Sequence, residues 1–278
     1  VTVHADDFGS GGNAFTIDFV TIGNPGNPVD TGTTGSYFSS YGAVSTAFQM
    51  GTYEISEDMI TKANTLGGLL ISKDTRGVNK PATNVTWNEA ARFVNWLNVS
   101  SGSSAAYKFA VQPGGVGYTG NENLVLWTVS DAGYDAGNLY RNTNARYFLP
   151  SENEWYKAAY HKNDGVTANY WDYATGSNSV PTQALTDGTL AGSAVFDGVE
   201  AGVPADPADV NMAGGLSAYG TMGQNGNVFE WNESALDGIN NSSSESRAFR
   251  GGAWYYAGGN LRSSDRNDDA PPASGSDV

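Results

Sequence analysis

The stretch PATNVTWNEAARFVNWLN, residues 81–98, decides how the central part of the chain folds. Thr86 is followed three residues later by Glu89, which is the spacing of a capping box at the start of a helix. The apolar residues after Thr86 recur at the spacing of a single helix face: Trp87, Ala90, Ala91, Val94 and Leu97. The sequence therefore predicts a capped helix that begins at Trp87 and buries this face.

Two further helix starts are visible on either side of this stretch. In FLPSENEWYKAAY, residues 148–160, Ser151 and Glu154 repeat the capping-box spacing, and Ser56 is placed to cap the segment EDMITKAN. The rest of the chain consists of short apolar runs between Gly, Asn and Asp, of which residues 124–129 predict a buried strand. This pattern is too irregular for a doubly wound sheet, so we expect an α+β domain dominated by loops.

The amino-terminal part of the chain differs from the rest. Residues 15–22 alternate between apolar and polar side chains, which predicts a strand, and an Asn-Pro-Gly turn follows soon after them. We therefore divide the chain into an arm with one strand, residues 1–44, and a main domain, residues 45–278.

Composition and charge exclude several classes of function. The 278 residues include 14 Lys and Arg against 29 Asp and Glu, a net charge of −15, which argues against a nucleic-acid partner. No apolar run approaches the length of a membrane span. Cysteine is absent and only two His are present, so the chain has no thiol chemistry, no disulfide and no site made of three His.

Two glycine-rich motifs complete an ordered set. They are YGTMGQNGNVFEWNE, residues 219–233, and RAFRGGAWYYAGGNLRSSDRN, residues 247–267. Together with the two capped helices, they resemble, in order, the motifs of the formylglycine-generating-enzyme family, also called the sulfatase-modifying-factor family. The resemblance covers roughly residues 45–267 and implies an irregular, C-type-lectin-like α+β fold. The segment FTIDFVTIGNPGN is similar to the lead-in of secreted or surface-anchored bacterial members.

The resemblance also indicates which chemistry is missing. The aerobic enzymes of the family use two Cys to hold copper and attack the substrate, and the corresponding positions here fall at about Tyr256 and Leu261. We therefore expect no copper and no formylglycine formation.

Family members bind calcium through two backbone carbonyls and a carboxylate, which correspond here to Gly226, Val228 and Glu230. An upstream Asn or Asp of the family is replaced by Gly223. The alternative is that this turn and its apolar side chains serve only the core.

A candidate ligand-binding cleft follows the Arg250-Gly251-Gly252 turn, where the enzymes of the family have their active-site cleft. Its aromatic, amide and charged residues are Trp254, Tyr255, Tyr256, Asn260, Arg262, Asp265 and Arg266. Tyr faces and Arg forks could hold a peptide, a glycan or a neighbouring subunit. The structural alternative is that Trp254 packs in the core and that Arg262 and Arg266 pair with internal carboxylates.

These observations favour a non-catalytic, extracellular or cell-surface module for binding or structure, stabilised by calcium. One alternative is a self-assembling subunit of a surface layer or filament. The family normally closes with a strand that would begin near Val278, and the arm, or a neighbour's arm, would then supply the missing pairing. A second alternative is an enzyme with different chemistry in the same cleft.

Overall fold

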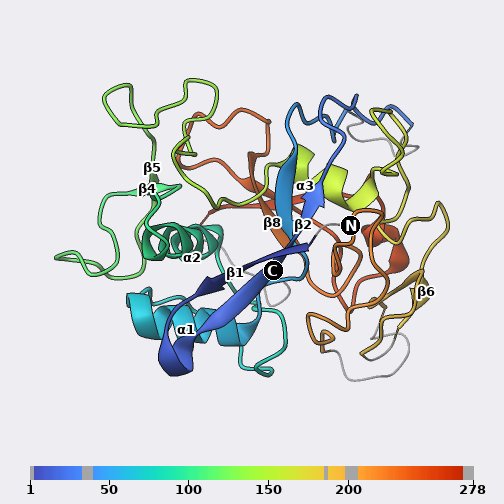
Figure 1. The fold of residues 1–278 in the computed structure, drawn as a ribbon, viewed down its shortest axis with the longest axis horizontal. Coiled ribbons are helices and arrows are strands. Elements are labelled where there is room, and N and C mark those ends of the chain that lie inside the picture. Colours follow the sequence, from blue (N-terminus) through green and yellow to red (C-terminus); the bar gives the residue numbers. More distant parts are fainter. Residues whose placement is uncertain (1–2, 33–39, 185–186, 198–205, 272–278) are drawn as a thin grey trace.

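The computed structural model describes residues 3–32, 40–184, 187–197 and 206–271. Within these residues, the helices are α1 (Glu57–Gly67), α2 (Trp87–Ser100) and α3 (Glu152–Tyr160). The strands are short and form small sheets, and long loops connect them (Figure 1). The predicted loop-rich α+β architecture is confirmed. No helix of the described residues has the length and apolar character needed to cross a membrane.

The amino-terminal sheet contains β1 (Val3–Phe8), β2 (Phe15–Ile22) and β3 (Phe48–Gly51), all antiparallel and in that order. The predicted strand at residues 15–22 is confirmed, and its alternating side chains bury Phe15, Ile17, Val20 and Ile22. Both edges of β2 are occupied by strands of its own chain. Among the described residues, this strand therefore does not pair with the carboxyl-terminal sheet, which the self-assembly alternative allowed for the chain's own arm.

The carboxyl-terminal sheet has the order β10-β9-β8, formed by β8 (Glu230–Ala235), β9 (Arg247–Arg250) and β10 (Asn267–Asp269). A shift in register interrupts the pairing of β8 and β9 between Trp231 and Ala235. Glu230 lies opposite Arg250 in this sheet. The sheet therefore brings together the two glycine-rich motifs that the sequence singles out.

Two minor sheets are made of two-residue strands. The first pairs β4 (Lys108–Phe109) with β5 (Leu124–Val125), and the second pairs β6 (Thr182–Gln183) with β7 (Ser193–Ala194). The prediction of a buried strand over residues 124–129 is wrong beyond Val125, and of the two residues in β5 only Leu124 is buried. Val129 is 85% exposed, because Asp131 accepts hydrogen bonds from Thr128 and turns the chain there.

The helix starts are capped as the sequence predicts. The side chains of Ser56, Thr86 and Ser151 each accept a hydrogen bond from a backbone N–H of the first helical turn. In α2, the Glu89 carboxylate accepts from the Thr86 N–H at 2.9 Å, and in α3 the Glu154 carboxylate accepts from the Ser151 N–H at 2.7 Å. Both capping boxes are complete.

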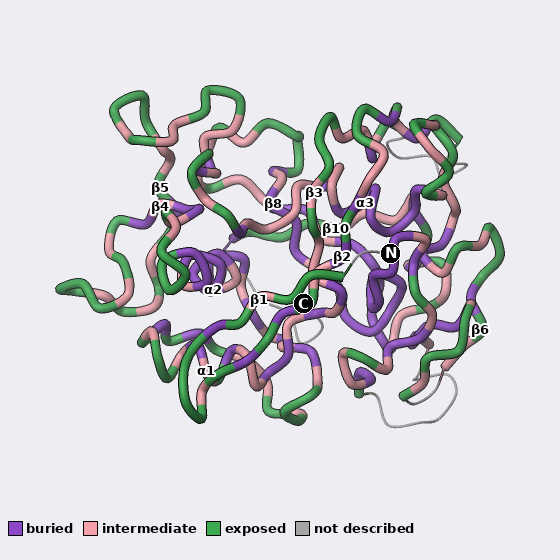
Figure 2. The backbone as a smooth tube through the Cα atoms, in the orientation of Figure 1, coloured by how far each residue is buried: buried purple, intermediate pink, exposed green. Residues whose placement is uncertain are grey.

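The main core joins the amino-terminal sheet to the helices. Phe8, Phe15 and Ile17 pack in the same buried cluster as Trp87 and Leu97 of α2. Figure 2 shows α2 as a mostly buried element near the middle of one half of the molecule. Several residues of this cluster, together with residues 222–231, line the cavity described below.

We expect Thr86→Ala and Ser151→Ala each to lower the free energy of unfolding by about 1 kcal/mol, because each substitution leaves helix N–H groups without their acceptor. Urea denaturation followed by circular dichroism measures the loss. Ser10→Ala is the matched control, since Ser10 precedes a 3-10 turn without making a side-chain cap. Equal stability of all three variants would contradict the capping argument.

Candidate functional site

The segment after β9 carries the predicted ligand-binding residues. Of these residues, Trp254 is buried and Arg262 is exposed, whereas Tyr255, Tyr256, Asn260, Asp265 and Arg266 are partly buried. The rings of Tyr255 and Tyr256 lie 4.7 Å apart between centroids. The segment contains the short 3-10 turn η2 (Gly258–Leu261), which lies between β9 and β10 in the chain. It therefore presents two tyrosines and an arginine near the surface on a short, anchored loop.

One arginine of this set belongs to a buried ion-pair network. The Glu152 carboxylate accepts hydrogen bonds at 2.7 Å from Arg250 and, in a bidentate pair, from Arg266. Arg250 also donates to the backbone carbonyls of Ser263 and Asp265. Arg266 therefore pairs with an internal carboxylate, as the structural alternative predicts. Arg262 instead donates to the Tyr173 hydroxyl at 2.9 Å.

An aromatic side chain from the amino-terminal segment covers this network. The Tyr41 ring centroid lies 4.8 Å from the guanidinium of Arg250 and 5.6 Å from that of Arg266. Glu152 offsets one of these two positive charges, and the tyrosine face interacts favourably with both. Sequence reasoning did not identify Glu152 or Tyr41 as partners of the arginines, because the contacts join segments that are about a hundred residues or more apart.

The predicted calcium turn is held by backbone hydrogen bonds to its neighbours. Gly226 has φ +90°, and a Cβ atom there would lie 2.1 Å from the Val195 carbonyl oxygen. The Gly226 N–H donates to the Gly251 carbonyl, and the Asn227 carbonyl accepts from the Trp254 N–H, each at 2.8 Å. The turn therefore fixes the start of the candidate ligand-binding segment.

Two carboxyl groups meet beside this turn. Glu230 accepts from the Trp155 indole N–H at 2.6 Å, and Glu54 accepts from the Asn227 side chain at 2.6 Å and from the Val228 N–H at 3.3 Å. Burial raises the pKa of Glu230 to about 7. Burial, followed by the negative charge of Glu230, raises the pKa of Glu54 well above its usual range.

Within the part of the chain that the structure describes, no cationic side chain pairs with these two carboxyl groups. Among the described residues, no Lys, Arg or His nitrogen lies within 4 Å of either one. Glu54 lies in the loop between β3 and α1, and no motif of the sequence marks it. Its carboxyl fills the space next to Gly223, where an added Cβ would lie 2.7 Å from the Glu54 Cδ.

The oxygen atoms of Glu54, Glu230 and the turn are of the kind that binds a hard cation. Calcium binds six to eight oxygen atoms, and two uncompensated carboxylates beside backbone carbonyls are typical of its ligands. The described residues contain no group of three or more acidic or histidine side chains arranged for a metal. The carbonyls of Gly226 and Val228 would therefore have to complete the coordination by Glu230 and Glu54.

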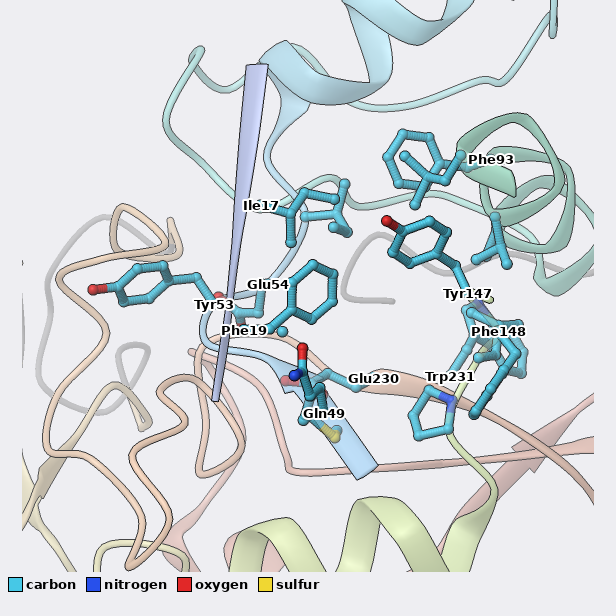
Figure 3. Close-up of a pocket in the computed structure, with 18 of the residues that line it drawn as sticks. Ile17, Phe19, Gln49, Tyr53, Glu54, Phe93, Tyr147, Phe148, Glu230 and Trp231 are labelled. Carbon is cyan, nitrogen blue, oxygen red and sulfur yellow. The ribbon is translucent and has the colours of Figure 1, made fainter. Parts of the chain in front are cut away.

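A cavity of about 630 Å³ opens on the same two carboxyl groups. It lies between the β2–β3 strands, α2, residues 147–150 and residues 222–231. Figure 3 shows Phe93, Tyr147 and Phe148 on one side of the space and Glu54 with Phe19 on the other, while the Tyr53 ring points away. Sequence reasoning did not predict this cavity, because its walls come from segments that are distant in the sequence.

Comparisons with known proteins give one consistent result. The model of a sulfatase-modifying factor enzyme 1-like domain matches residues 34–278. Treponema denticola variable protein 1 has a similar structure, with a TM-score of 0.66 and 17% identity over 98% of this chain and 96% of that chain. A solved structure described as CarF has a TM-score of 0.63 and 19% identity over 94% and 95%. No curated protein gives a significant match. At these identities the structural likenesses concern the fold.

Proposed function

The chain belongs to the sulfatase-modifying factor enzyme 1-like family, and from this premise we propose that it works as a binding module. It contains no Cys, so the copper-holding and substrate-attacking thiols of the aerobic enzymes are absent. Residues 256 and 261, where the resemblance places those thiols, are Tyr and a fully buried Leu. The family's usual chemistry is therefore unavailable to this chain.

The proposed binding surface is the segment from Trp254 to Arg266. The observation that carries this proposal is its anchoring at both ends, by the Trp254 N–H to the Asn227 carbonyl and by Arg266 to Glu152. A rigid support lowers the cost of ordering the residues that touch a ligand. Between the anchors, Tyr255, Tyr256 and Arg262 offer ring faces and a guanidinium, which suit a peptide or a glycan.

Binding to printed arrays of peptides and glycans tests this proposal. We expect Tyr255→Ala and Arg262→Ala to remove the signals of the unmodified protein while both variants remain folded at the temperature of the assay. Lys62→Ala is the control, because it removes a positive charge from α1, far along the chain from this segment. Arrays on which both variants bind as the unmodified protein does would refute the assignment of this surface.

We place this module outside the cell or on its surface. The amino-terminal segment similar to secreted members supports this proposal, as does the structural likeness to a variable protein of Treponema denticola. The rival role is a self-assembling subunit. The observation that favours it is β1, whose pairing among the described residues is with β2 alone, so its other edge is open to a strand of another chain. Light scattering of the purified protein over a range of concentrations separates the two, since a monomer keeps a constant mass.

The proposal includes calcium at the turn of Gly226, Val228 and Glu230, with Glu54 in the place of the family's upstream side chain. We expect a chelator to lower the melting temperature and added calcium to restore it, because a ligand that binds only the folded state adds about 2.7 kcal/mol at a hundredfold excess over its Kd. Glu230→Gln should abolish this response. A melting curve that ignores both chelator and calcium would leave the turn as part of the core only.

A further inference from the structure

The cavity between β2–β3 and α2 has the size and lining of a small-molecule site. Its volume of about 630 Å³ lies within the range of ligand pockets, roughly 300–1,000 Å³. Most of its wall is hydrocarbon or aromatic, including Phe19, Phe93, Tyr147, Phe148 and Trp231. Such a wall favours a ligand with an apolar body, because burial of apolar surface is the main source of affinity.

Only some of the acidic side chains in the cavity wall are paired with basic ones. Asp6 accepts hydrogen bonds from Arg146, from the Tyr147 hydroxyl and from His4, so its negative charge is offset. Elsewhere in the wall, Glu154 pairs with Arg141 at 3.2 Å. This leaves the carboxyls of Glu54 and Glu230 as the acidic groups of the wall that have no cationic partner in the described part of the chain.

The two carboxyls are also held in position. The Trp155 indole fixes Glu230, and the Asn227 amide fixes Glu54, each with a hydrogen bond of 2.6 Å. A carboxylate has about four acceptor sites, so each group can accept further hydrogen bonds from a ligand. Gln49 of β3 is exposed and also lines the cavity, so the wall includes a residue that reaches solvent.

We propose that this cavity binds a small organic cation, an amine or guanidine attached to an aromatic or alkyl body. The cationic head hydrogen-bonds Glu54 and Glu230, and the body packs among Phe19, Tyr147 and Trp231. A neutral molecule of the same shape would leave the two buried carboxyls without an offsetting positive charge, and an anionic one would be repelled by them, so both would bind less tightly. This site is separate from the surface at residues 254–266, and its failure would leave that surface proposal untouched. It uses the same two carboxyls as the calcium proposed above, so an organic cation and calcium exclude each other there, and the chelator in the test below keeps calcium out.

The test uses three matched series of probes with one to four methylenes between a phenyl ring and the head group: phenylalkylamines, phenylalkanols and phenylalkanoates. Isothermal titration calorimetry in the presence of a chelator measures their affinities for the full chain. We expect at least one amine to bind about tenfold or more tightly than its alcohol, and no acid to bind. Amines that bind no better than their alcohols would overturn the proposal.

Variants of Glu54 and Glu230 show whether a bound amine contacts these two carboxyls. Glu54→Gln and Glu230→Gln should each weaken the best amine about tenfold or more while leaving the weak binding of the matched alcohol unchanged. Asp58→Asn, which removes a carboxylate of α1 that is outside the cavity wall, should leave both affinities unchanged. Retained amine affinity in both Gln variants would overturn the proposal even if the amine binds, because the cation would then lie elsewhere.

Discussion

Replacing Glu152 with Gln is expected to lower the free energy of unfolding by about 3–5 kcal/mol. Glu152 is 2% exposed and is the carboxylate that receives both Arg250 and Arg266. The substitution keeps the shape of the side chain but removes the charge, so the buried Arg250 and the partly buried Arg266 both lose the carboxylate that pairs with them. For a domain of this size, the melting temperature should fall by roughly 10 °C.

The matched control is Asp58→Asn, which removes a carboxylate from the first turn of another helix. Asp58 pairs with Lys62 at 2.7 Å near the surface, where an ion pair contributes about 0.5 kcal/mol. Calorimetry should therefore separate the two variants by several degrees. A Glu152→Gln protein as stable as Asp58→Asn would mean that the two arginines do not depend on Glu152.

The second large effect is expected for Gly226→Ala. The φ of Gly226 is +90°, which L side chains rarely adopt, and the added Cβ would lie 2.1 Å from a backbone oxygen of Val195. Backbone cannot move aside as a flexible side chain can, so the Asn227 contacts to Glu54 and Trp254 would shift as well. We expect a loss of about 3 kcal/mol or more in chemical denaturation.

Gly238→Ala is the control that separates the cost of a positive φ from the cost of the steric clash with Val195. Gly238 has φ +79°, but an added Cβ there meets nothing within 4 Å. This variant should lose about 1–2 kcal/mol from the backbone conformation alone. If both glycine variants lose the same amount, the close approach of Val195 to the turn has no energetic consequence, and the turn would not be the rigid support proposed above.

The local structure could be predicted from the sequence where neighbouring residues determine it. The caps of α2 and α3 depend on residues three positions apart, and the alternation along residues 15–22 identifies β2. The run at 124–129 failed as a predictor because hydrophobicity alone does not reveal the turn that Asp131 imposes. Short apolar runs give weak evidence for strands for this reason.

The site could be predicted only in part. The sequence motif points to Glu230, but its neighbour Glu54 lies 176 positions earlier in an unremarkable loop. Similarly, the sequence suggests an internal carboxylate for Arg266 without showing that Glu152 serves Arg250 as well. Such contacts depend on how distant segments pack, and no local spacing encodes them.

The central claim is that this chain has the fold of the family but does not oxidise a peptide Cys to formylglycine. Mass spectrometry of a sulfatase-motif peptide tests this claim most directly. The peptide is incubated with the protein, copper and oxygen, alongside a family enzyme that carries the Cys pair. We predict that the enzyme converts the peptide Cys to formylglycine and that this protein leaves it unchanged at the background level. Formylglycine above background with this protein would contradict the claim.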